Sequence, residues 1–212
     1  MRLGASRLYA GAMPLGNRRT ATRVRDGRVQ KKNNWSPDRG DYFALRQDEV
    51  RLDRRSPRRE FHHVTTVPQL RTFAGLLPDW DEVAAGLQAI VLDEGQDCMG
   101  WYSPGVVAVC AWEQGLWWEQ GDRGFEGTTA TCWTDSGCER VKVGDRLQVR
   151  WTAEQARAFQ LLHILPHELG HHHDRITTRS KRRASRGENY AESYAYRPLD
   201  AVWPSYARHF GI

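Results

Sequence analysis

Apolar residues recur at helical spacing over residues 156–171. Three leucines fall on one side of the predicted helix: Leu162, Leu165 and Leu169. His167 and His171 are four residues apart, so they lie one turn above each other on the opposite side. The pattern therefore predicts a helix that packs through one face and presents two imidazoles from the other.

Pro166 interrupts this helical pattern. A proline has no amide hydrogen to donate to the carbonyl of Leu162, so it favours a kink or a break. We expect either a kinked helix or two helices, the first of which spans residues 152–165. Thr152 and Gln155 have the spacing of a capping box at its start.

Shorter apolar runs predict strands over residues 60–66, 87–93, 106–112 and 141–151, with a helical turn at 68–77 and a turn at 98–105. Strands followed by helices indicate an α+β fold. We expect a small, twisted, mainly antiparallel sheet that packs on the helix with the two histidines.

The residues His167-Glu168-Leu-Gly-His171 form an HExxH motif inside this helix. Two imidazoles that converge on one point provide half of a zinc site. Glu168 lies about 100° further around the helix, where it is placed to bond a metal-held water rather than the metal. The motif therefore predicts Glu168 as a general base.

A catalytic zinc ion needs a third protein ligand and one open position. A short segment that favours a helix, residues 187–196, carries Glu188 and Glu192 four residues apart. One of these carboxylates can bind the metal while the other bonds a ligating imidazole and fixes its tautomer.

HExxH followed by Glu-x-x-Ala-Glu-x-Tyr-Ala resembles the gluzincin class of zinc metallopeptidases, in particular the minimal ImmA/IrrE-like domains. The resemblance covers residues 100–196 and implies a zincin-like fold, with Glu188 as the third ligand and Ala191 allowing close helix packing. It also implies an edge strand beside the cleft, for which residues 106–112 are our candidate. The family usually has Asn or Asp where this chain has Glu192.

Other zinc-site patterns fit the sequence less well. A metzincin motif would need glycine at Asp174 and histidine at Thr177, and neither is present. The SprT-like proteases take a downstream histidine, and only His209 is available. Asp174 itself returns to the face of His167, and we interpret it as an outer-shell partner or a helix-terminal residue.

Several nearby side chains are further candidates for contact with substrate or transition state. His172 is predicted to lie above Glu168, where it could steady that carboxylate or an oxyanion, and Tyr190 could donate to the oxyanion. His163 is expected to face the cleft. We expect His173 and Tyr194 to pack instead.

Positive charge is concentrated at the N-terminus. Residues 1–60 hold 16 Lys and Arg against 7 Asp and Glu, and the whole chain has a net charge of +5. Residues 1–58 also lack apolar periodicity, so we expect a basic, poorly ordered region before a metallopeptidase domain at 59–212. The basic region could contact nucleic acid or another acidic partner, or be a solvated tail.

Residues 175–186 hold six Lys and Arg and no acid. They either border the cleft and favour an acidic substrate or form an exposed connector. No apolar run resembles a secretory signal or a membrane span, so we expect a cytoplasmic protein without membrane contact. In that compartment the four cysteines are expected as free thiols, with a Cys132–Cys138 bridge as the alternative.

These observations together predict a hydrolase. His167, His171 and Glu188 would hold Zn²⁺, Glu168 would act as base, and the substrate would be a protein or peptide. The alternative is a catalytically silent zinc-binding module that contacts nucleic acid or a regulatory protein through its basic segments.

Overall fold

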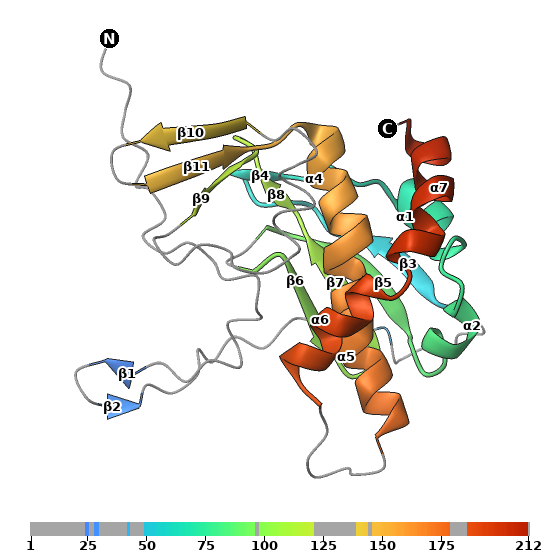
Figure 1. Cartoon of the computed structure of the whole chain (residues 1–212). Coiled ribbons are helices and arrows are strands. Elements are labelled where there is room, and N and C mark those ends of the chain that lie inside the picture. The colour runs from blue at the N-terminus through green and yellow to red at the C-terminus, as the bar shows by residue number, and fades with distance from the viewer. Residues whose placement is uncertain are drawn as a thin grey trace.

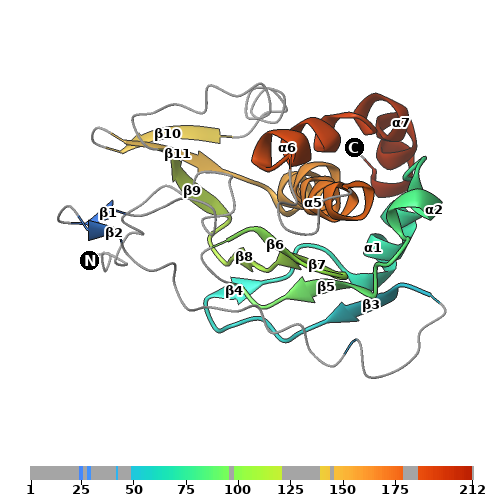
Figure 2. The ribbon, with the colours of Figure 1, turned by 90° about the horizontal axis from the view of Figure 1, so that it is seen from below.

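The computed structural model describes residues 24–25, 28–29, 42, 49–95, 98–120, 139–143, 146–178 and 186–211. It is a mixed α+β fold in which the helices lie over one face of a small sheet, as Figures 1 and 2 show. None of the described helices is long and apolar enough to cross a membrane. Cys132, Cys138 and most of the loop 175–186 lie outside the described residues.

The central sheet has four strands in the order β3-β5-β7-β6. They are β3 (Arg51–Arg54), β5 (Ala89–Asp93), β7 (Val106–Cys110) and β6 (Gly100–Ser103). β3 and β7 each run parallel to β5, and only β6 pairs antiparallel, with β7. The expectation of a mainly antiparallel sheet was therefore wrong for the sheet that carries the helices.

β7 is an inner strand, which corrects the expectation that residues 106–112 form the edge beside the cleft. All five residues of both β5 and β7 are buried, as befits strands covered on both faces. The edge strand on that side is β6, which lies within the segment 98–105 that we had predicted as a turn. The strand expected at 60–66 is shorter than predicted, since β4 comprises only Phe61–His62.

β3 precedes residue 59 and still belongs to this sheet. The hydroxyl of buried Tyr42 donates to Asp53 of β3, at 2.9 Å. The central sheet therefore contains residues from both sides of position 58, so the expected boundary at that position does not separate a region outside the sheet from the domain that contains it.

The chain also forms smaller sheets. β4 pairs with β8 (Trp112–Glu113), and β1 (Val24–Arg25) pairs with β2 (Arg28–Val29). β9 (Trp117–Gln120), β10 (Glu139–Val143) and β11 (Arg146–Arg150) form an antiparallel sheet of three strands. β10 and β11 match the strand or hairpin expected at 141–151.

The helix with the HExxH motif runs without a break from α4 (Ala153–Phe159) through a π-helical turn, η1 (Gln160–Ile164), into α5 (Leu165–Thr177). The expected capping box of Thr152 and Gln155 is present at its start. The π-helical turn precedes Pro166 and widens the helix there, with the amide of Leu165 bonded to the carbonyl of Gln160. The proline therefore changes the helix locally but does not divide it.

The side chain of Gln160 ties this turn to the sheet. Its amide donates to the carbonyl of Cys110 at 2.8 Å, and its oxygen accepts from Thr65 at 3.0 Å. These bonds satisfy a buried polar side chain and fix the height of the helix above β7.

The remaining helices pack around α5. α1 (Val67–Ala74) and α2 (Trp80–Val83) precede β5, and α6 (Glu188–Tyr196) and α7 (Leu199–Phe210) end the described chain. α6 lies beside α5 in both ribbon views. The main apolar core lies between the sheet and α5, where Leu92, Val109 and Leu165 are almost fully buried.

Candidate metal centre

α5 and α6 approach each other closely at Gly170. A Cβ atom added there would lie 2.9 Å from Cα of Ala191 and from Cβ of Tyr194. Glycine on one helix and alanine on the other therefore allow the two backbones to meet. This contact brings the first turn of α6 alongside the turn of α5 that carries the motif histidines.

Glu188, the first residue of α6, faces both motif histidines. Its Oε2 atom lies 3.3 Å from Nε2 of His167 and 3.5 Å from Nε2 of His171. Ligand atoms about 2.1 Å from a tetrahedral zinc ion are about 3.4 Å apart. The two separations that involve Glu188 thus match a tetrahedral metal site, and all three donor atoms lie within 4.8 Å of one another, so this His/Glu group could hold a metal ion.

Nε2 of His171 supports the same interpretation. It is buried and, apart from its long 3.5 Å contact with Glu188, has no hydrogen-bond partner among the described residues. A buried nitrogen without a bond is destabilising unless some ligand occupies it. A metal ion bound by this group would satisfy it.

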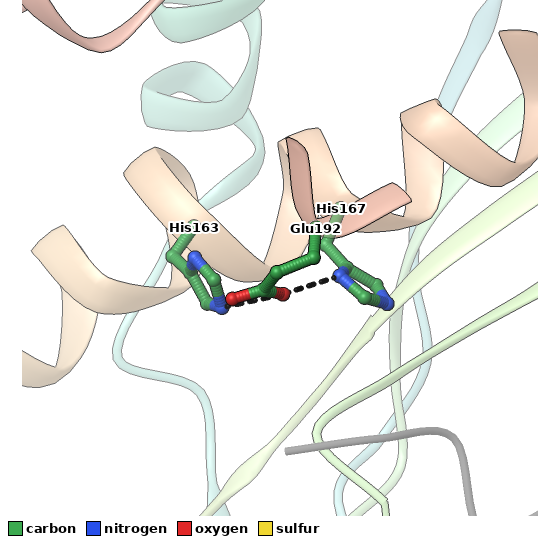
Figure 3. Close-up of side chains that lie close together, drawn as sticks. All are labelled: His163, His167 and Glu192. Carbon is green, nitrogen blue, oxygen red and sulfur yellow. Dashed lines mark hydrogen bonds and ion pairs between the residues drawn. The ribbon is translucent and has the colours of Figure 1, made fainter. Parts of the chain in front are cut away.

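A second group of donors lies beside the first. Glu192 lies between the rings of His163 and His167, as Figure 3 shows, with Oε2 3.0 Å from Nδ1 of His167 and 3.7 Å from Nε2 of His163. The first distance is that of a hydrogen bond, and the second exceeds the edge of a zinc tetrahedron. Glu192 therefore suits the outer-shell position, where it accepts the Nδ1 proton of His167 and leaves Nε2 for the metal.

Charge in the metal-free site is shared between His167 and the two carboxylates. Burial lowers the pKa of His167, but the hydrogen bonds with Glu188 and Glu192 outweigh it and raise this pKa to about 10. Burial acts in the opposite sense on Glu188, whose pKa the two histidines nevertheless lower to about 2. A proton on His167 therefore supplies positive charge between these carboxylates, at the place where a metal ion could bind.

Glu168 is 4% exposed and belongs to neither metal-ligating group of the described residues. It lies on the side of α5 that faces the sheet, because a Cβ atom added to Gly100 of β6 would be 2.9 Å from Cγ of Glu168. Its carboxylate is also close enough to Cys110 of β7 to contribute to raising that thiol's pKa. Glu168 thus lies beside the ligands rather than among them.

Asp174 does not bond a ligand imidazole within the described structure. It is 1% exposed, and its Oδ1 accepts from Arg186 at 2.8 Å and from Thr178 at 2.9 Å. Asp174 was predicted to be either an outer-shell partner or a helix-terminal residue. Its bonds to Thr178 and Arg186, which lie beyond the end of α5, match the second prediction.

His172 and Tyr190 form their hydrogen bonds with groups outside the candidate metal site rather than with Glu168 or a metal-ligating residue. His172 donates to the carbonyl of Ala85 at 3.0 Å, so its ring anchors α5 to the segment after α2 instead of reaching Glu168. The hydroxyl of Tyr190 donates to Nδ1 of His173 at 2.6 Å. His173 and Tyr194 pack between α5 and α6, as expected.

The sequence patterns did not indicate Gly100 and Tyr102 as residues near the site. Both belong to β6. Tyr102 stacks on the ring of His171 with 6.4 Å between ring centroids. Because side chains alternate along a strand, Gly100 and Tyr102 share the face of β6 that covers α5. Only a correct prediction of β6 as a strand could have indicated them.

The chain was also compared with known proteins. No family model matches it, and neither a curated protein nor a solved structure does. The candidate site therefore rests on its own residues and geometry.

Proposed function

We propose that this protein is a zinc-dependent metallopeptidase that hydrolyses peptide bonds in a protein or peptide substrate. The observation that carries the proposal is the convergence of three donor atoms, from His167, His171 and Glu188, with Glu188 at the distances from both imidazoles that a tetrahedral zinc ion requires. The HExxH motif and its resemblance to the gluzincins support the same activity.

Zinc is the metal that suits this ligand set. Two neutral imidazoles and one carboxylate leave the fourth position of a tetrahedron open, as in catalytic zinc sites. A Zn²⁺ ion held by these residues would supply a water with a pKa of about 7 and would polarise a carbonyl oxygen.

The residues of the chain have distinct tasks in this hydrolysis. Glu168 accepts a proton from the attacking water at its carboxylate and then donates it to the leaving amine. Glu192 holds the Nδ1 proton of His167 and keeps that ring in the tautomer that exposes Nε2. Neither carboxylate needs to bind the metal for its task.

The substitution Glu168→Gln tests the proposal. The variant keeps the ligands, so it should retain zinc in elemental analysis and lose about 100-fold or more in cleavage of an unstructured protein or a peptide library. Glu60→Gln, at an exposed position outside the site, is the matched control and should cleave like the wild type.

Two results would contradict the proposal. If the wild type takes up no zinc, the metal site is wrong. If the wild type takes up zinc but cleaves no peptide, the alternative of a catalytically silent zinc-binding module is correct.

A further inference from the structure

We propose that Asp174 and Arg186 form a clasp that places Glu188 at the metal, so that metal affinity depends on two residues that do not bind the ion. The inference rests on the proposed metal site and adds positioning residues to it. Its basis is the way the chain returns from α5 to the first residue of α6.

Asp174 anchors the chain just before Glu188. Its Oδ1 accepts from Nε of Arg186 at 2.8 Å, and the backbone amide of Gly187 bonds the same carboxylate. Arg186 also donates to the hydroxyl of Thr177. Residues 186 and 187 are therefore both held on the last turns of α5.

Gly187 makes this entry to α6 sterically feasible. Its φ of 75° and ψ of −159° lie in a region that only glycine occupies readily. The turn at Gly187 brings its amide to Asp174 and lets α6 begin at the next residue.

A second anchor holds the chain just after Glu188. The hydroxyl of Tyr190 donates to His173, whose Nε2 donates in turn to Glu82 of α2 at 3.0 Å. The guanidinium of Arg186 lies 3.6 Å from the centre of the Tyr190 ring. The two anchors are thus in contact with each other.

Glu188 is bracketed between these anchors, one residue after Gly187 and two before Tyr190. A carboxylate in the first turn of a helix would otherwise move with the fraying of that end. The clasp removes this freedom, so the Glu188 carboxylate is already near His167 and His171 before the metal binds. Asp174 therefore acts on the metal through the position of Glu188.

The test measures zinc affinity by competition with a chromophoric chelator. Asp174→Asn and Arg186→Gln should each weaken zinc binding by about 10- to 100-fold, the loss seen when the support of a ligand is removed. Arg197→Gln is the matched control, because the Arg197 guanidinium also lies over the Tyr190 ring, 5.4 Å from its centre, but Asp174 bonds Arg186 instead. This control should bind zinc like the wild type.

A double-mutant cycle separates positioning from a general loss of stability. In a Glu188→Gln background the clasp substitutions should have little further effect on zinc affinity, because the ligand they position is gone. An equal loss in both backgrounds would overturn the inference, as would clasp variants with wild-type affinity. A wild type that binds no zinc would instead overturn the proposed metal site.

Hydrogen exchange on the metal-free protein provides a measurement that does not need zinc. Arg186→Gln should speed exchange of the amides at residues 187–191 relative to Arg197→Gln. Unchanged exchange there would contradict the clasp. The Arg186 side chain is 47% exposed, so Arg186→Gln should fold. The inference can therefore be tested with this variant even if Asp174→Asn, at a buried position, does not fold.

Discussion

Gly100 of β6 packs directly against Glu168 of α5: a Cβ atom at residue 100 would lie 2.9 Å from Cγ of Glu168. The same atom would meet Ile164 at 2.8 Å and the carbonyl oxygen of Ala108 at 3.0 Å. The carbonyl belongs to an inner strand and cannot move aside. The absence of a side chain at residue 100 therefore determines where the proposed general base can lie.

Gly100→Ala should displace Glu168 while leaving the metal ligands in place. We expect hydrolysis to fall by about 100-fold, because small displacements of catalytic groups have effects of that size, and stability to fall by about 1–3 kcal/mol. Zinc content should not change. Gly75→Ala is the control, because a Cβ atom there has only ordinary contacts, the nearest at 3.5 Å; equal activity of the two variants would contradict this role of Gly100.

Substitutions in the two donor groups distinguish which one holds the metal. Glu188→Gln should abolish tight zinc binding, whereas Glu192→Gln should weaken it by about 10- to 100-fold, as expected for an outer-shell partner. His163→Gln should leave the zinc affinity unchanged. Competition titrations check all three variants, and a loss of binding in His163→Gln as large as in Glu188→Gln would assign the metal to the group with Glu192.

The metal-free protein should lose stability at alkaline pH. The pKa of His167 is raised from 6.5 to about 10 in the folded chain, so its protonated form stabilises the fold fully below pH 6.5. This contribution is lost as pH rises from 6.5 towards 10. Thermal unfolding from pH 6 to pH 10 measures the loss, which should be absent from the zinc-loaded protein because the metal replaces the proton.

Zinc binding near neutral pH should accordingly release a proton from His167. Calorimetry in two buffers with different ionisation enthalpies measures it. Identical heats in both buffers would show that no proton leaves and that His167 was already neutral.

Cys110 should resist alkylation in the folded protein. Its contact with the thiol of Cys98, 3.8 Å away, and its complete burial raise the pKa of its thiol well above the usual value. With iodoacetamide at pH 8, peptide mapping should find Cys110 unmodified until the chain is unfolded. Rapid labelling of native Cys110 would show that the strand pair β6–β7 opens readily.

Local features of the site were predictable because they depend on residues close together in the chain. The spacing of His167 and His171 and the capping box of Thr152 and Gln155 follow from helix geometry alone. The hydrogen bond of one α6 carboxylate, Glu192, to a motif imidazole also followed from the four-residue separation of Glu188 and Glu192. The π-helical turn was not predicted, because Pro166 is compatible with a kink, a break or a widened helix.

The sequence by itself thus determined the chemistry that the helices can present, namely two imidazoles on one face of α5 and two carboxylates on one face of α6. Tertiary structure alone decided where these faces meet, through the contact of Gly170 with Ala191. It also decided the parallel pairing that makes β7 an inner strand, and the turning of His172 and Tyr190 towards Ala85 and His173. These outcomes depend on contacts between segments far apart in the chain, and such contacts leave no periodic pattern in the residues around them.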